Sequence, residues 1–247
     1  MDVSFRRVVV LTGPYGSGKT ELAIGLALAA QQRLACSPKP GPVVLADIDV
    51  LKPYFRSREA SDQLRAAGVS VIAPAGALAN SDLPILPAEL RGTLARNDVT
   101  AYLDVGGDPV GARALGSISD VVGAADHDVL LVLNRYRPFM DSVEHVLESA
   151  HQIEQASHLT FTGIVSNTHM LEQTTVHDVV WGLELAGGVA DALGVPVRLL
   201  GVPEGLSWES EAHAPGLPPV LRVRRYMKPE FMGGVVLAPP AGPSAAP

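Results

Sequence analysis

The amino-acid sequence predicts an α/β protein with a mostly parallel, twisted sheet of about seven strands and helices on both faces. Short apolar runs alternate with longer segments of helical periodicity, and the runs are nearly continuous, as in strands buried on both faces. A glycine-rich segment joins the first run to the first helix. The 247 residues predict one large domain over residues 1–230. Residues 231–247, rich in Pro, Ala and Gly, are predicted to form a flexible tail.

Seven apolar runs are the predicted strands, and they cover residues 7–12, 43–47, 69–72, 100–104, 128–134, 160–166 and 197–201. Residues 21–33, rich in Leu and Ala, predict the first helix. Residues 142–157 and 175–193 repeat apolar residues at helical spacing. Their predicted buried faces hold Val143, Val146, Leu147, Ala150 and Ile153, and Val176, Val179, Val180, Leu183 and Ala190. Thr175 followed by Asp178 approximates a capping box at the start of the last helix.

Composition and charge exclude several classes of protein. The formal net charge of −7 argues against a protein that coats a nucleic-acid backbone. The single cysteine cannot form an internal disulfide or a Cys-rich metal site. Because no apolar run reaches about 18 residues, the sequence predicts no membrane-spanning helix. The apolar run near the start is too short for a signal peptide, and we therefore expect a cytoplasmic protein.

The strongest chemical signal is a match to the phosphate-loop pattern G-x-x-x-x-G-K-[ST], formed by Gly13, Pro14, Tyr15, Gly16, Ser17, Gly18, Lys19 and Thr20. Its glycines allow backbone N–H groups to point at phosphate oxygens, and the following helix adds the positive end of its dipole. In this pattern the lysine reaches the terminal phosphates and the threonine hydroxyl is a Mg²⁺ ligand. We therefore predict that residues 13–20 bind a nucleotide, with Lys19 catalytic and Thr20 on the metal.

Acidic residues and glycines end two further predicted strands at the same edge of the sheet. Asp47 and Asp49 follow the second strand, and Asp104 closes the fourth. We predict that Asp47 and Asp104 serve the Mg²⁺ side of the site, with Asp104 also catalytic, and that Asp49 orients the attacking water. Gly106 and Gly107 are predicted to sense the γ-phosphate through their amides. The alternative is that these aspartates cap turns and that the glycines form a simple turn.

Asn167, at the end of the sixth predicted strand, is predicted to read the edge of a purine base, with an ordinary turn asparagine as the alternative. Guanine selection in many phosphate-loop proteins uses an Asn-Lys-x-Asp segment whose carboxylate pairs with the ring nitrogens. The candidates here are residues 134–137, Asn-Arg-Tyr-Arg, and residues 167–170, Asn-Thr-His-Met. Neither segment ends in aspartate, and the sequence therefore favours ATP with Mg²⁺.

The segments GPYGSGKTELA, ADIDV, DVGGD and GIVSN, with VPE at residues 202–204, resemble the nucleotide-binding domains of the MinD/ParA/CobQ type. DIDVLKPYFRSRE, ANSDLPILPAEL and RRYMKPE are closest to an uncharacterised bacterial branch of that family. The resemblance spans about residues 5–230 and implies the fold, ATP, Mg²⁺ and a homodimer. The family's loop has a lysine after its first glycine that reaches the partner's nucleotide. Here that residue is Pro14, and Lys52, Arg56 or Arg58 can supply the missing charge.

Polar and basic residues also follow the predicted strands at this edge. A protein partner or small-molecule substrate is predicted to contact Arg56, Arg58, Asn80, Asp82, Arg135 and Arg137. The alternative places them on solvated loops and rigid connectors. A later basic cluster, Arg222, Arg224, Arg225 and Lys228, either binds an anion or an acidic partner or protects an exposed edge strand.

These observations predict a Mg²⁺-dependent ATPase whose hydrolysis is coupled to a conformational or dimerisation switch. The alternative is an ATP-dependent kinase or synthetase that activates a carboxylate on a small molecule, as dethiobiotin synthetase does. A third hypothesis is a nucleotide sensor without appreciable turnover. A flat apolar face beside the nucleotide favours the switch, whereas a closed polar pocket opposite the γ-phosphate favours the small-molecule enzyme.

Overall fold

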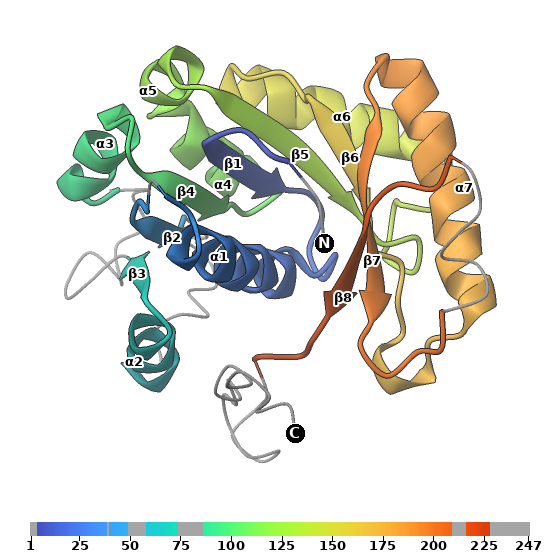
Figure 1. Cartoon of the computed structure of the whole chain (residues 1–247). Helices are drawn as coiled ribbons and strands as arrows, with labels where there is room; N and C mark the ends of the chain where they lie inside the picture. The colour runs from blue at the N-terminus through green and yellow to red at the C-terminus, as the bar shows by residue number, and fades with distance from the viewer. Residues whose placement is uncertain (1–3, 39, 49–57, 74–85, 209–215, 228–247) are drawn as a thin grey trace, which may run out of the picture.

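Eight parallel strands form the sheet of the described chain (Figure 1). The computed structural model describes residues 4–38, 40–48, 58–73, 86–208 and 216–227. The strands are β1 (Val8–Thr12), β2 (Val43–Asp47), β3 (Val69–Ile72), β4 (Thr100–Asp104), β5 (His127–Leu133), β6 (Gly163–Ser166), β7 (Val197–Pro203) and β8 (Val220–Val223). Their order is β3-β2-β4-β1-β5-β6-β7-β8, with every neighbouring pair parallel. The predicted fold class is confirmed.

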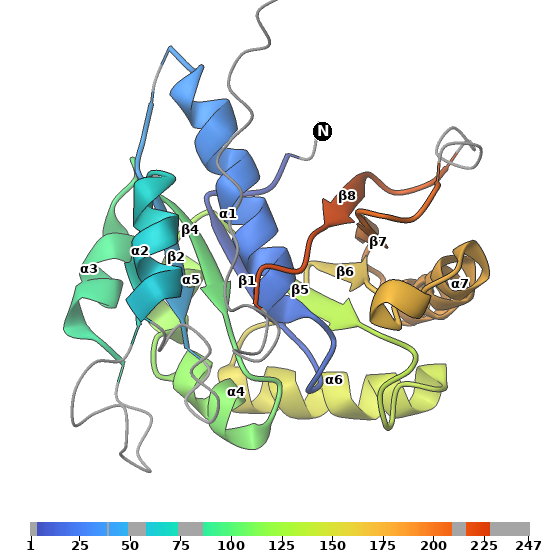
Figure 2. The same ribbon diagram turned by 90° about the horizontal axis from the view of Figure 1, so that it is seen from below.

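Helices cover both faces of this sheet, as Figure 2 shows. They are α1 (Lys19–Ala35), α2 (Arg58–Ala66), α3 (Ala88–Ala95), α4 (Pro109–Gly116), α5 (Ser119–Ala124), α6 (Val143–Ser157) and α7 (Val176–Leu193), with a 3-10 helix at Leu171–Gln173. Val9 and Leu11 of β1 pack in the core under α1 and α2, whereas Val8 and Val10 pack in the core under α3 to α7. Because both faces are buried, the strands are continuous apolar runs.

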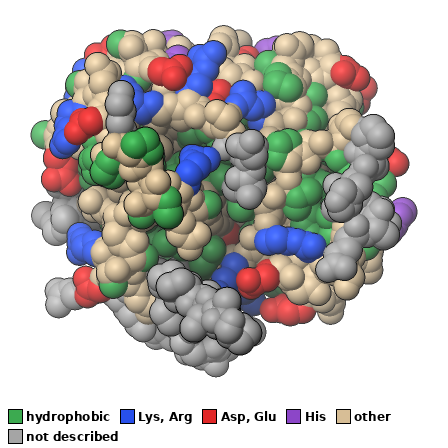
Figure 3. Space-filling model, viewed as in Figure 1, with side chains coloured by type: hydrophobic (Ala, Val, Ile, Leu, Met, Phe, Trp, Pro, Cys, Tyr) green, Lys and Arg blue, Asp and Glu red, His purple; other side chains and the backbone are tan. Residues whose placement is uncertain are grey.

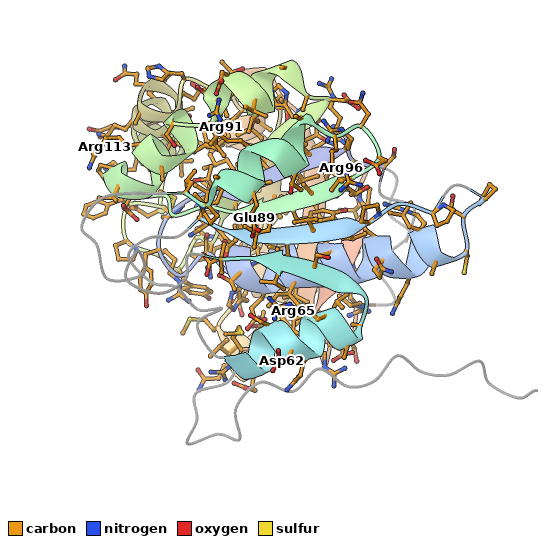
Figure 4. The ribbon with its side chains drawn as sticks, turned by 90° about the vertical axis from the view of Figure 1, so that its left-hand side faces the viewer. Asp62, Arg65, Glu89, Arg91, Arg96 and Arg113 are labelled. Carbon is orange, nitrogen blue, oxygen red and sulfur yellow. The ribbon has the colours of Figure 1, made fainter. Side chains whose placement is uncertain are left out.

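The side of the molecule nearest β3 is built from α2, α3 and α5 (Figure 4). On its surface Arg65 lies 3.5 Å from Asp62, and Arg91 donates a hydrogen bond to Asp120 at 2.5 Å. Exposed ion pairs of this kind contribute little to stability because water and salt screen them. The buried leucines of these helices, Leu64 of α2 and Leu90 and Leu94 of α3, pack into the core and stabilise them more than the ion pairs do.

All seven predicted strands are present, and the differences concern strand ends and the eighth strand. β6 begins at Gly163 and not at residue 160, because the N–H of Phe161 donates to Glu154 Oε1 at 2.9 Å and takes no part in the sheet. β8 is missing from the sequence prediction, because the exposed charged side chain of Arg222 interrupts its apolar residues. β8 lies at the edge of the sheet, which agrees with the edge-strand interpretation of Arg222.

The two amphipathic helices begin as the sequence predicts. The Thr175 hydroxyl accepts from the N–H of Asp178, and the Asp178 carboxylate accepts from the N–H of Thr175, so the capping box is confirmed. The predicted inner face of α6 is buried or half-buried throughout. On α7 the prediction for Val180 is wrong: this side chain is 39% exposed, because the helix turns it away from the sheet.

Two glycines of α7 provide a matched test of the packing between this helix and the loop after β6. A Cβ on Gly182 would lie 2.1 Å from Thr168 Oγ1, whereas a Cβ on Gly187 would have no atom within 4 Å. We expect Gly182→Ala to destabilise the protein by about 1–3 kcal/mol through overpacking. Gly187→Ala is expected to stabilise it by up to about 1 kcal/mol, because alanine favours the helix. Urea unfolding of both variants checks this, and equal effects would contradict the packing.

The surface carries mixed charge. Acidic and basic side chains are interspersed over the face shown in Figure 3. In the described ranges, no helix combines the length and the apolar character needed to cross a membrane.

Candidate functional site

The candidate site lies where the strand order changes direction. β1 lies between β4 and β5, with β2 to β4 on one side of it and β5 to β8 on the other, so the chain crosses from one side of β1 to the other between β4 and β5. In parallel α/β sheets, ligands bind at the carboxyl ends of strands at such a point. The predicted phosphate loop, residues 13–18, connects the end of β1 to α1 at this place.

Side chains from distant parts of the chain hold the carbonyl groups of this loop. Asn167 Nδ2 donates to Ser17 O at 2.7 Å, and Arg137 Nε donates to Gly16 O at 2.7 Å. Lys19 Nζ donates to the carbonyls of Gly13 and Pro14 at 2.9 and 3.1 Å. These bonds fix the orientation of the peptide planes, which is what an anion-binding loop requires.

The helix that follows begins without a side-chain cap. Gly18 is the N-cap of α1, with φ of 86° and no side-chain hydrogen bond to the first turn. This left-handed conformation favours glycine, and a Cβ there would lie 2.4 Å from Asn167 Nδ2. The N–H groups of an uncapped first turn, together with the helix dipole, form a binding site for anions such as phosphate. The loop and helix therefore fit the phosphates of a nucleotide.

The segment after β4 lies directly against the loop. A Cβ on Gly107 would come within 1.9 Å of the carbonyl oxygen of Gly13, so only glycine allows this approach. The hydroxyl of Thr12 lies 3.5 Å from the carbonyl of Gly106. The structure thus places Gly106 and Gly107 beside the predicted phosphate loop, and their role as γ-phosphate sensors stays a prediction.

Two of the predicted carboxylates are neighbours beneath the start of α1. Thr20 Oγ1 donates to Asp104 Oδ2 at 2.6 Å, and Asp104 is 2% exposed. Asp47 is the register partner of Asp104 on the adjacent strand and is also buried. Residue 49 lies outside the described residues. A hydroxyl beside carboxylates is the donor set that Mg²⁺ takes next to nucleotide phosphates, so these residues fit the predicted metal.

A cavity of about 640 Å³ opens next to the phosphate loop. Its lining comes from residues within 15–21 of the loop and α1, within 167–174 after β6, from the end of β7 and the turn after it (203–206), and from the end of β8 and the segment after it (within 223–227), together with Arg137. All of these segments follow strands at the carboxyl edge of the sheet. The volume lies within the range of small-molecule and cofactor sites.

Asn167 and His169 lie on the side of the cavity away from β4. Asn167 is buried between the phosphate loop and β7, since a Cβ on Gly201 would meet its Oδ1 at 2.2 Å. His169 Nδ1 lies 3.4 Å from the N–H of Leu171. Burial, together with the smaller effect of the nearby Arg137, lowers the pKa of His169 to about 4. His169 is therefore neutral at physiological pH and presents a polar, uncharged imidazole to the cavity.

The two predicted arginines after β5 point in different directions. Arg137 faces the phosphate loop and lines the cavity. Arg135 faces α7: its guanidinium lies 4.2 Å from the ring centre of Trp181 and donates to the Trp181 carbonyl at 2.7 Å. The structure therefore does not bring Arg135 to the cavity. The side chains of Arg56, Arg58, Asn80, Asp82 and Lys228 lie outside the described residues.

Sequence reasoning missed Glu21, which lines the cavity next to Thr20. Its carboxylate accepts from the N–H groups of Tyr226 and Met227 at 2.8 and 3.0 Å. Burial raises the pKa of Glu21 to about 7, although these two N–H groups and Arg225 act in the opposite direction. The only indication in the sequence is that Glu21 directly follows the phosphate-loop threonine. Its hydrogen-bond partners, Tyr226 and Met227, lie about 205 residues later in the chain.

Comparisons with known proteins place this geometry among solved structures. No protein-family model and no curated protein sequence matches the chain. It is similar to the cell division protein FtsY from Thermotoga maritima, with 22% identity, a TM-score of 0.50 and coverage of 83% of this chain and 66% of that one. It is also similar to the signal recognition particle receptor FtsY from Elizabethkingia anophelis, with 23% identity, a TM-score of 0.51 and coverage of 81% of this chain and 58% of that one. A third similar structure is the signal recognition particle 54 kDa protein from Aeropyrum pernix in complex with GDP. It has 21% identity, a TM-score of 0.50 and coverage of 78% of this chain and 41% of that one.

The chain spans from about two fifths to two thirds of the lengths of these proteins, and at these identities the likeness concerns the fold. It supports the predicted resemblance to MinD/ParA/CobQ-type domains only at the level of the phosphate-loop fold, and it does not show the specific MinD/ParA family. The chain has the α/β fold of the P-loop NTPases, with its glycine-rich loop at the carboxyl end of the central strand.

Proposed function

We propose that this protein is a Mg²⁺-dependent nucleoside triphosphatase that prefers ATP and couples hydrolysis to a conformational or dimerisation switch. The observation that carries the proposal is the contact between Thr20 and Asp104 at 2.6 Å, beside an uncapped helix and a clamped phosphate loop. The loop and the start of the helix can bind phosphate, and the contact between Thr20 and Asp104 can support a metal. These parts lie together at the end of β1, where hydrolysis needs them.

Each residue has a role in this proposal. Lys19 binds the terminal phosphates, exchanging its bonds to loop carbonyls for bonds to phosphate oxygens. Thr20, oriented by Asp104, holds the metal together with Asp47. Mg²⁺, when bound, neutralises part of the charge on the β- and γ-phosphates. Asp49 orients the attacking water, and the amides of Gly106 and Gly107 respond to the γ-phosphate.

The preference for ATP rests on the polar groups around the base side of the cavity. The asparagines at residues 134 and 167 are not followed by an aspartate at the guanine-reading spacing. Of the glutamates that line this side, Glu172 lies 3.5 Å from Arg225 and Glu204 lies 3.7 Å from Arg224, so both carboxylates already face a cation. His169 is neutral, so this imidazole adds no positive charge to the cavity wall.

Exposed apolar side chains favour the switch over the small-molecule enzyme. Within the described ranges, large exposed apolar residues lie in the phosphate loop, after β5, after β6 and on α7, and they are Tyr15, Tyr136, Phe139, Met170, Leu171 and Val180. Tyr15 and Leu171 also line the cavity. Exposed apolar groups such as these two, beside a nucleotide cavity, favour a surface that meets a protein partner.

Steady-state hydrolysis with ATP and with GTP tests the proposal. We expect kcat/KM to be about 5–150-fold higher for ATP, because GTP leaves polar groups on a buried base edge without partners. Phosphate release measured with each nucleotide and Mg²⁺ gives the ratio of the two kcat/KM values. The measurement is repeated with the other nucleotide present as a competitor. Equal or better use of GTP would refute the base assignment. A phosphorylated metabolite found in place of free phosphate would support the kinase or synthetase alternative.

A further inference from the structure

The segment that follows β8, residues 224–227, runs back to the start of α1. The N–H of Tyr226 donates to Glu21 Oε2 at 2.8 Å, and the N–H of Met227 donates to Glu21 Oε1 at 3.0 Å. Both carboxylate oxygens of Glu21 are thus engaged by consecutive backbone groups about 205 residues away. The ring of Tyr226 lies over α1, since a Cβ on Gly25 would come 3.9 Å from it.

The same segment contacts the two loops on the base side of the cavity. Arg224 Nε lies 3.7 Å from Glu204 Oε2, after β7, and Arg225 Nη1 lies 3.5 Å from Glu172 Oε1, after β6. Each ion pair is partly exposed and contributes little by itself. Together with Glu21 they join one short segment to three separate parts of the cavity wall. Arg224, Arg225 and Met227 line the cavity themselves.

Glu21 lies in the first turn of α1 and is half-buried. A polar side chain that loses contact with water there needs hydrogen-bond partners, whereas an apolar side chain would be enough for packing against α1 alone. The two oxygens of Glu21 provide acceptors for the backbone of Tyr226 and Met227, which lie beyond the end of β8 at Val223.

We propose that residues 224–227 form a strap that closes the base side of the nucleotide cavity, and that Glu21 is the positioning residue that ties this strap to the phosphate-loop helix. The proposal rests on the proposed nucleotide site. It also assigns a function to Arg224 and Arg225 of the basic cluster, which hold the strap to the loops after β7 and β6. Because the strap joins three parts of the cavity wall, opening its tether to Glu21 is expected to speed the release of a nucleotide.

Dissociation of a fluorescent ATP analogue from the full chain, measured by stopped flow with Mg²⁺ and excess unlabelled ATP, tests the strap. Glu21→Ala removes both acceptors, Glu21→Gln keeps one, and Met227→Pro removes one donor. We expect Glu21→Ala to speed dissociation about tenfold or more, with Glu21→Gln intermediate. The double variant Glu21→Ala/Met227→Pro is expected to dissociate at the rate of Glu21→Ala alone, because both changes open the same tether.

Amide exchange of Tyr226 and Met227 in the nucleotide-free chain tests the tether independently. We expect slow exchange in the unmodified chain and faster exchange in Glu21→Ala. Wild-type dissociation rates in the single variants, multiplicative effects in the double variant or fast exchange in the unmodified chain would each overturn the strap while leaving the nucleotide site intact. If the unmodified chain binds no nucleotide at all, the proposed function fails, and the strap's role in nucleotide retention fails with it.

Discussion

Lys19→Ala is expected to lower ATP hydrolysis by about 10²–10³-fold, because it removes a preorganised positive charge from the reacting phosphoryl group. In the structure the Lys19 ammonium lies within hydrogen-bond distance of two carbonyls of the phosphate loop. It is therefore held at the site before any phosphate binds. Phosphate release at saturating ATP and Mg²⁺ measures the effect.

The fold is expected to survive this change, since Lys19 is at the first position of α1 and alanine favours a helix. Thermal unfolding checks this point. Arg65→Ala is a matched control: it removes an exposed cation from α2 and is expected to leave hydrolysis unchanged. Unchanged ATP binding and hydrolysis in Lys19→Ala would contradict the assignment of the phosphate loop.

The second large effect is expected from Asp104→Asn. This change keeps the size of the side chain and removes a buried negative charge next to Thr20, so the metal loses a nearby partner. We expect the Mg²⁺ concentration for half-maximal nucleotide binding to rise by about tenfold or more, since a unit charge a few ångströms away is worth several kcal/mol at intermediate dielectric. Titration of Mg²⁺ at fixed ATP measures it.

Asp49→Asn is the contrasting variant, because we assign Asp49 to the attacking water. It should bind ATP with the normal Mg²⁺ dependence and hydrolyse it more slowly. If both variants showed the same change in Mg²⁺ dependence and the same residual turnover, the division of roles would be wrong. If neither changed hydrolysis, the nucleotide sensor would become the better hypothesis.

The sequence predicts those parts of the fold and site that depend on local patterns. Residues 13–20 match the phosphate-loop pattern, and the groups that this pattern uses to bind phosphate all lie within the segment itself. The apolar strands are recognisable because both faces of a parallel sheet are buried. The proximity of Asp104 and Thr20 is predictable from the sequence, because the carboxyl ends of parallel strands lie at one edge of the sheet.

The remaining parts depend on contacts that no local pattern encodes. Arg135 and Arg137 are two residues apart, but a turn in which Asn134 O accepts from the N–H of Arg137 sends one side chain to α7 and the other to the phosphate loop. Glu21 finds its partners about 205 residues later. β8 is four residues long and is defined by its pairing with β7. Each of these features results from tertiary packing.

Calorimetric titration of ATP into the full chain with Mg²⁺ measures whether the cavity beside residues 13–20 binds a nucleotide. We expect saturable binding at one site per chain, weakened when EDTA removes Mg²⁺ and severely weakened in Lys19→Ala. The absence of saturable binding for both ATP and GTP, in protein that is folded by circular dichroism, would contradict it.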